Sequence, residues 1–173
     1  MKKYLKNKYV ISGIIISILI LLDQLTKILA NKYLTLGSTK VIIPYILEFQ
    51  LVKNNGASFG MLEGKLWLFI IITIIALSAF IYLLKDGNYK NKKVYTISIN
   101  LLIGGTLGNF IDRLFRSNHV VIDFLVLPFL TRTNISFLQF IFNLADLFLT
   151  FGIVLLAIDI IFLERKRKYG NQN

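Results

Sequence analysis

Four long apolar runs dominate this 173-residue sequence. A helix needs about 20 consecutive apolar residues to cross the hydrocarbon core of a bilayer, and four stretches meet that requirement, at about 10–30, 66–84, 94–112 and 138–163. The first run follows a basic start, as in a secretory signal, but no small-residue cleavage pattern follows it, so we expect a permanent span. The sequence therefore predicts an all-α membrane protein with four transmembrane helices, in a single domain that covers residues 1–173.

Basic residues predict how these helices are oriented. The chain has 20 Lys and Arg residues against nine acids, and the basic residues gather at the start, around 85–93 and at 165–168. Because loops rich in Lys and Arg stay on the cytoplasmic side, we expect both termini and the middle linker to face the cytoplasm. Attraction to anionic phospholipids accounts for the remaining excess of positive charge. The net charge of +11 therefore does not indicate a nucleic-acid partner.

The two outward-facing segments, at about 36–62 and 117–130, differ in composition from the spans. Residues 41–52 and His119–Phe124 are rich in β-branched and aromatic types, which predicts short strands in a small extracytoplasmic β-sheet, accompanied by a short outward loop or helix. The sequence has no cysteine, which excludes disulfides and thiolate catalysis. A single histidine without suitable neighbours does not predict a metal site.

Several charged and polar side chains interrupt the apolar runs. A charge inside the membrane costs at least ~2.5–3.5 kcal/mol, so such residues usually face protein or water and have partners. Asp23 and Lys27 lie four residues apart on one helix face, where they could form an ion pair that orients the helix, or contact a substrate. Arg113 shares a face with Asn109 and Asp112, and its side chain could reach the headgroups or point inward to hold polar groups.

Other features allow a purely structural interpretation. Gly104, Gly105 and Gly108 would let neighbouring helices approach closely. The segment Asn54-Asn55-Gly56 is a turn signal, which fits an ordinary loop as well as a functional one. Asp159 lies near the cytoplasmic end of the fourth run, where Arg165 or water could satisfy it.

Asp123 and Asp146 are the most interesting chemical candidates. If the fourth helix starts near Leu138 and runs inward, Asp146 lies about 12 Å below that start, at a depth that Asp123 on the outward strand could share. Two crowded carboxyl groups hold a single proton, so that one can activate water while the other donates to a carbonyl. This is the chemistry of aspartyl peptide hydrolysis, although nothing in the local spacing forces the two residues to meet.

Four motifs in this order resemble those of lipoprotein signal peptidase, also called signal peptidase II, and the resemblance covers essentially the whole chain. The family patterns are D-Q-x-T-K, N-x-G-A-x-F, G-G-x-x-G-N-x-I-D-R, and V-x-D-F followed by F-N-x-A-D. They correspond here to Asp23–Lys27, Asn54–Phe59, Gly104–Arg113, and Val121–Phe124 followed by Phe142–Asp146.

The resemblance implies a membrane aspartyl endopeptidase that removes the signal peptide from diacylglyceryl-modified prolipoproteins, cutting immediately before the lipidated cysteine. It implies a monomer in the bacterial cytoplasmic membrane, with its site toward the outer face, contacts with membrane phospholipids, sensitivity to cyclic peptide inhibitors, and no metal or cofactor. Carried over by position, Asp123 and Asp146 are the catalytic pair. The substrate-binding or supporting residues are Asp23, Lys27, Asn54, Gly56, Gly108, Asn109, Asp112, Arg113, Asn143 and Ala145.

The sequence also departs from the family pattern. Phe140 stands where the family commonly has Pro, Leu147 follows the second acid where Ser is frequent, and the segment that contains Pro128–Phe137 is longer than usual. We expect these departures to change local geometry and inhibitor contacts rather than the reaction.

Two other classes of function stay open at this stage. A transport or channel component could use Asp23, Lys27, Asp146 and Asp159 as a relay, but a relay should spread its acids through the membrane depth, whereas all of these acids except Asp159 crowd the outer side. A non-catalytic assembly protein would tolerate conservative changes at the aspartates.

Overall fold

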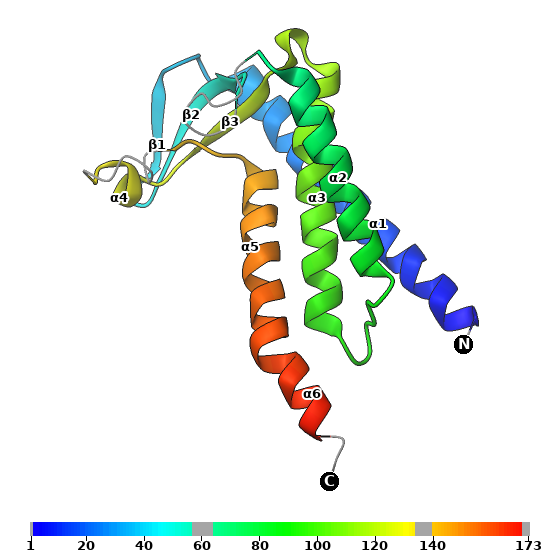
Figure 1. The fold of residues 1–173 in the computed structure, drawn as a ribbon. Helices are drawn as coiled ribbons and strands as arrows, with labels where there is room; N and C mark the ends of the chain where they lie inside the picture. The colour runs from blue at the N-terminus through cyan, green and yellow to red at the C-terminus, as the bar shows by residue number, and fades with distance from the viewer. Residues whose placement is uncertain (1, 57–63, 134–139, 171–173) are drawn as a thin grey trace.

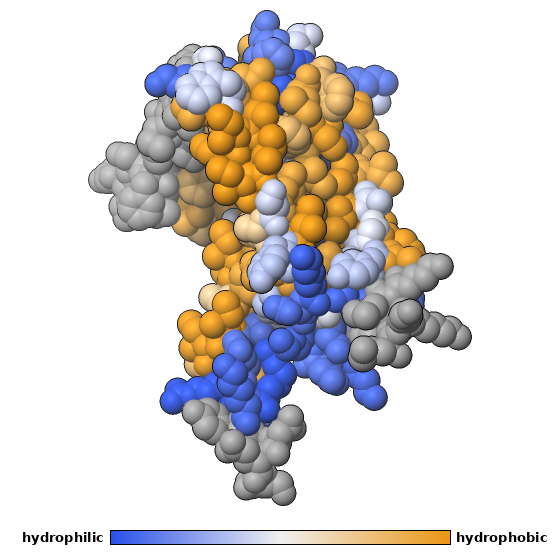
Figure 2. Space-filling view, turned by 45° about the vertical axis from the view of Figure 1, so that its right-hand side comes forward, coloured by the Kyte–Doolittle hydropathy of each residue, from blue (hydrophilic) through white to orange (hydrophobic). Residues whose placement is uncertain are grey.

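The computed structural model describes residues 2–56, 64–133 and 140–170. Four helical segments are long and apolar enough to cross a membrane: α1 (Lys2–Tyr33), α2 (Leu66–Leu84), α3 (Lys93–Phe115), and α5 (Leu144–Ile158) continued by η4 (Asp159–Leu163) and α6 (Glu164–Gly170). The predicted membrane fold is confirmed. Figure 1 shows the small sheet at one end of the helices and both chain termini at the other, and Figure 2 shows an apolar band between hydrophilic ends.

Helix α3 is the central helix of the bundle and packs against α1, α2 and α5. Its contact with α5 depends on glycine, since a Cβ atom at Gly105 would lie 2.5 Å from the carbonyl oxygen of Ala145. A Cβ atom at Gly108 would lie 2.6 Å from a carboxylate oxygen of Asp23 on α1. The packing interpretation of these glycines is therefore confirmed, because any larger residue would push the three helices apart.

The three strands form one antiparallel sheet in the order β1 (Thr39–Ile43), β2 (Leu47–Asn54) and β3 (Val121–Val126). The apolar stretch 41–52 is thus a hairpin rather than one strand, with its turn at Pro44-Tyr45-Ile46, where Tyr45 has a φ of 63°. His119 lies outside the sheet, in the single turn η2 (Ser117–His119). The short outward helix is α4 (Pro128–Thr131).

The fourth spanning helix begins later than the sequence predicted. The expected start at Leu138 lies outside the described residues, but residues 140–143 are not helical, and α5 begins at Leu144. The backbone just before α5 pairs with β3 instead: Phe142 donates its N–H to the carbonyl oxygen of Leu125 (3.1 Å) and accepts from the N–H of Leu125 (2.8 Å). Asp146 therefore lies in the first turn of the helix, and the expected depth of about 12 Å below the helix start is wrong.

Candidate functional site

Asp123 lies on the central part of β3 and is only 3% exposed. Both of its carboxylate oxygens accept hydrogen bonds from amide side chains. Asn54, at the end of β2, donates through Nδ2 to Oδ2 (2.9 Å), and Asn143 donates through Nδ2 to Oδ1 (2.6 Å). The antiparallel pairing of β2 with β3 thus aligns the turn residue Asn54 with this carboxylate.

Asp146 occupies the third position of α5 and takes part in its N-terminal cap. The side-chain oxygen of Asn143 accepts from the N–H of Asp146 (3.1 Å), and the N–H of Asn143 donates to Oδ2 of Asp146 (3.1 Å). This reciprocal capping box satisfies two N–H groups of the helix start. Asn109 on α3 donates to the other oxygen, Oδ1, over 2.7 Å.

Asn143 is therefore bonded to both carboxyl groups of the predicted pair. Its side chain reaches Asp123 and its backbone reaches Asp146, and it is itself fully buried. The extended backbone of Asn143, with φ −128° and ψ −176°, places it at the cap, ahead of the helix. This position lets one residue connect the strand to the helix.

The environment of Asp123 changes its acidity. The pKa of this carboxyl is raised from 3.8 to about 6: burial is the largest cause, the nearby charge of Asp146 acts in the same direction, and the hydrogen bonds from Asn54 and Asn143 lower it in part. A shared proton is the expected behaviour of two carboxyl groups that influence each other in this way. The site is therefore electrostatically prepared for acid–base chemistry.

A consequence for stability follows from this raised pKa. The pKa of Asp123 is higher in the folded than in the unfolded protein, so ionisation of this carboxyl destabilises the fold. The free energy of unfolding therefore falls as the pH rises from about 4 through about 6. We expect the stability of Asp123→Asn relative to the wild type to increase by about 3 kcal/mol over that range. Thermal unfolding in detergent at pH 4, 5, 6 and 7.5 measures this. A constant difference across the series would contradict it.

A buried cluster of charges supports the pair from the side of α1. Lys27 lies 2.9 Å from Oδ2 of Asp23 and 3.2 Å from Oδ2 of Asp112, and all three side chains are fully buried. The predicted ion pair is confirmed and gains a second carboxylate from α3. Lys27 also donates to Oδ1 of Asn109 over 2.9 Å, which leaves the amide NH₂ of Asn109 directed at Asp146.

Asp23 and Asp112 also accept hydrogen bonds from backbone N–H groups close to the carboxyl pair. Asp23 accepts the N–H of Ala145 in the first turn of α5 (2.9 Å), an arrangement favoured by the positive end of the helix dipole. Asp112 accepts the N–H of Ile122 (3.2 Å), the residue next to Asp123. The two carboxylates thus fix α5 to α1 and β3 to α3.

Two members of this cluster were missing from the predicted site. Gln24 donates to the carbonyl oxygen of Gly108 (3.0 Å) and to Oδ1 of Asp112 (3.1 Å). Arg116 pairs with Asp112 over 2.7 Å. The spacing of four residues between Asp112 and Arg116 is a signal that could have indicated the second ion pair.

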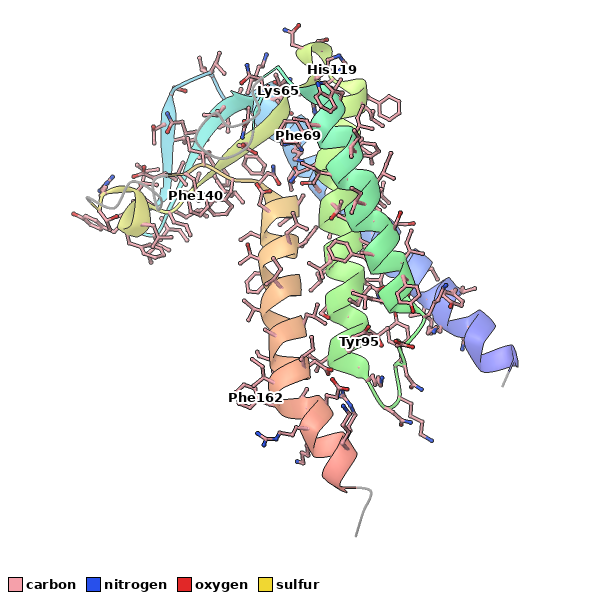
Figure 3. All side chains as sticks on the ribbon, viewed as in Figure 1. Lys65, Phe69, Tyr95, His119, Phe140 and Phe162 are labelled. Carbon is pink, nitrogen blue, oxygen red and sulfur yellow. The ribbon has the colours of Figure 1, made fainter. Side chains whose placement is uncertain are left out.

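Arg113 points into the protein rather than toward headgroups. Its guanidinium donates to the carbonyl oxygens of Asn109 and Gly56, each over 3.3 Å, and lies 4.2 Å from the ring centroid of Phe69 on α2. Figure 3 shows Phe69 at the sheet end of that helix. Gly56 in turn donates to the side chain of Asn54. Arg113 thereby ties the turn beside Asp123 to α3; the other residues of this motif, 57–59, lie outside the described residues.

An apolar groove leads to this group of polar residues. It lies between α2, α3 and α5, has a volume of about 460 Å³, and contains Asn109 and Arg113 among its lining residues. The remaining lining is mainly aliphatic and includes Ile72, Leu149 and Ile153. A hydrophobic segment lying in this groove would bring its polar end to the carboxyl pair.

Asp159 does not join the other acids. It pairs with Arg167 over 2.6 Å, not with the expected Arg165, at the end of the bundle that carries the termini. Within residues 2–56, 64–133 and 140–170, no group of three or more His, Asp or Glu side chains is arranged to hold a metal ion. Of the departures from the family pattern, Phe140 packs beside Phe142 with ring centroids 5.7 Å apart.

Comparison with known proteins agrees with these observations. Residues 15–162 match the family described as signal peptidase (SPase) II. Proteins named lipoprotein signal peptidase are similar to this chain: that of Halalkalibacterium halodurans is 38% identical over 90% of this chain and 94% of its own, and that of Streptococcus agalactiae is 40% identical over 95% and 98%.

Two solved structures have the same fold. Both are described as a bacterial membrane enzyme, at 1.9 Å and 2.3 Å resolution, and both are 38% identical to this chain. The first has a TM-score of 0.71 and covers 87% of this chain and 92% of its own, and the second has a TM-score of 0.72 and covers 91% and 90%. The fold therefore agrees with that of a multi-pass membrane enzyme.

Proposed function

The chain belongs to the signal peptidase II family, and on that premise we propose that it is a membrane aspartyl endopeptidase of lipoprotein maturation. It removes the signal peptide from diacylglyceryl-modified prolipoproteins by cutting immediately before the lipidated cysteine. The name of its relatives supports the substrate class. The catalytic assignment to Asp123 and Asp146 rests on one observation: Asn143 is hydrogen-bonded to both carboxyl groups.

The raised pKa of Asp123 makes it the carboxyl that holds the shared proton more readily. Asp146, which accepts from Asn109 and from the N–H of Asn143, is then the ionised partner. It removes a proton from a water molecule while the water oxygen adds to the scissile carbonyl carbon, and Asp123 gives its proton to the carbonyl oxygen. The product of this step is a neutral gem-diol.

The second step breaks the peptide bond. The proton now on Asp146 passes to the leaving nitrogen, which becomes the amino group of the lipidated cysteine. Asp123 takes back a proton from the gem-diol as the carboxylic acid of the signal peptide forms. The pair returns to its starting state with one proton, so the reaction needs no metal or cofactor.

The groove between α2, α3 and α5 fits the hydrophobic part of a signal peptide. Its aliphatic lining suits an apolar helix, and its polar residues Asn109 and Arg113 lie beside the carboxyl pair. Cyclic peptide inhibitors of the family would compete for the same groove. The proposed enzyme acts as a monomer.

The orientation in the membrane follows from the distribution of charge. Twelve of the 20 Lys and Arg residues lie in the segments at the same end as both termini, and the carboxyl pair lies toward the end with the sheet. Loops rich in Lys and Arg stay in the cytoplasm. The protein would therefore lie in the bacterial cytoplasmic membrane with both termini inside and its site toward the outer face.

A product-mapping experiment tests the proposal. The purified protein in detergent is given a diacylglyceryl-modified prolipoprotein, and separately the same precursor without the lipid, and the products are measured by mass spectrometry. We expect one new amino terminus, at the lipidated cysteine, and at least about 100-fold slower cleavage of the precursor without lipid, since remote binding energy is lost with it. Cleavage at another bond, or equal rates on both precursors, would contradict the proposal.

A further inference from the structure

A second polar pocket lies at the opposite end of the bundle from the carboxyl pair. It has a volume of about 360 Å³ and is formed by the linker before α3 on one side and by η4 and α6 on the other. Four cations and one acid line it: Lys90, Lys93, Lys166, Arg167 and Asp159. Figure 2 shows hydrophilic surface gathered at this end, directly below the apolar band.

The acid in this pocket is already neutralised within the protein. Arg167 donates to both oxygens of Asp159, over 3.0 and 2.6 Å, and Asp159 is only 1% exposed. In the part of the chain that the structure describes, neither Lys93 nor Lys166 is paired with a carboxylate. The pocket therefore keeps an excess of positive charge that would attract an anion.

The backbone that carries these lysines is held in place. In the linker, the side-chain oxygen of Asn88 accepts the N–H groups of Lys90 and Asn91, and the Asn88 carbonyl accepts the N–H of Lys92 over 2.8 Å. On the other side the helix passes through a π-helical turn at Asp159–Leu163, a feature often found at functional sites. Two fixed segments, distant in sequence, thus face one pocket.

Exposed apolar side chains lie on the π-helical turn that borders this pocket. Ile160, Ile161 and Phe162 on η4 are 52–64% exposed, and Figure 3 shows Phe162 on the outer side of the helix. A ligand that contacts both the basic pocket and the exposed apolar side chains would carry a phosphate for the lysines and acyl chains for the apolar surface. A free phosphate ion would use only the first.

We propose that this pocket binds the phosphate headgroup of an anionic phospholipid from the leaflet on the side of the chain termini. Basic pockets beside membrane helices on that side are suited to such headgroups. The lipid would connect the start of α3 to the end of the α5–η4–α6 segment through Lys93 and Lys166. This inference goes beyond the proposed peptidase function and does not depend on it.

Thermal unfolding of the full chain in a neutral detergent tests the inference. We expect dioctanoyl phosphatidylglycerol to raise the midpoint in a saturable way, whereas dioctanoyl phosphatidylcholine and inorganic phosphate at the same concentrations do not. The variant Lys93→Gln/Lys166→Gln should need at least about tenfold more phosphatidylglycerol for the same shift, and each single variant should show a smaller loss of affinity. The matched control is Lys32→Gln, which changes an exposed lysine near the C-terminal end of α1, far from the pocket. This variant should respond like the wild type.

Three results would overturn the inference. The double variant and both single variants could respond like the wild type, which would place the lipid elsewhere. Phosphatidylcholine could stabilise the protein equally, which would show that charge is not recognised. Inorganic phosphate could give the same shift, which would make the ligand a soluble anion rather than a lipid.

Discussion

Replacing Asp146 by Asn lowers the rate of prolipoprotein cleavage by about 10³- to 10⁴-fold, and Asp123→Asn lowers it as much, because each change removes one half of a proton-transfer pair. An amide at position 146 accepts no proton from water, and an amide at position 123 has no acidic proton for the carbonyl oxygen. Since both groups act in one step, the double variant should be about as slow as either single variant. Initial rates on a lipid-modified prolipoprotein in detergent measure all three.

The matched control for this experiment is Asp86→Asn. It makes the same chemical change at an exposed residue of the α2–α3 linker, and it should cleave at the wild-type rate. Thermal unfolding of each variant separates loss of chemistry from loss of fold. Wild-type cleavage by a folded Asp123→Asn or Asp146→Asn protein would remove the carboxyl pair from the mechanism and favour the non-catalytic assembly protein.

Lys27→Met is expected to have the largest effect on stability. It leaves Asp23 and Asp112 buried with one fewer cation between them, and the loss of one partner from a buried ion pair costs about 3–5 kcal/mol. The change also removes one of the two donors to Oδ1 of Asn109 and leaves only the hydrogen bond from Asn143 (3.0 Å). The amide that donates to Asp146 is then held less firmly, and cleavage should slow. A fall in the midpoint of thermal unfolding in detergent measures the first effect.

A second variant separates charge from packing at this position. Lys27→Met/Asp23→Asn restores the balance of charge. The side-chain oxygen of the asparagine at position 23 can still accept the N–H of Ala145. The double variant should recover part of the stability that Lys27→Met loses, a coupling that a double-mutant cycle measures. Lys32→Met, an exposed change on the same helix, should cost less than about 0.5 kcal/mol. If Lys27→Met were as stable as Lys32→Met, the buried cluster would have no structural role.

The arrangement of the helices was predictable from the sequence because each span is a long apolar run. The ion pair between Asp23 and Lys27 was predictable for a similar reason, since residues four apart on a helix always face the same way. Both features depend on local periodicity. The prediction that Asp123 and Asp146 form a pair came from the family resemblance, because their spacing of 23 residues does not indicate that they meet.

The start of α5 was not predictable from hydropathy. Residues 138–143 are mostly apolar and carry no charge, so hydropathy continues the run through them. The break comes from pairing with β3, which is a contact distant in sequence, and from the local capping box between Asn143 and Asp146. The shared helix face of Asn109 and Asp112 is confirmed, since both side chains contact Lys27 on α1. Helix periodicity could not identify that partner, because Lys27 is distant in sequence.

The cap at Asn143 also affects the order in which the site forms during synthesis of the chain. Asp123 lies on the last strand and Asp146 on the last span, so a chain still being made holds only one of the two acids until its final hydrophobic segment has crossed the membrane. Asn143, which touches both, joins them when α5 begins to form. On the proposed assignment of Asp123 and Asp146, the catalytic pair is complete only after α5 has been made and inserted.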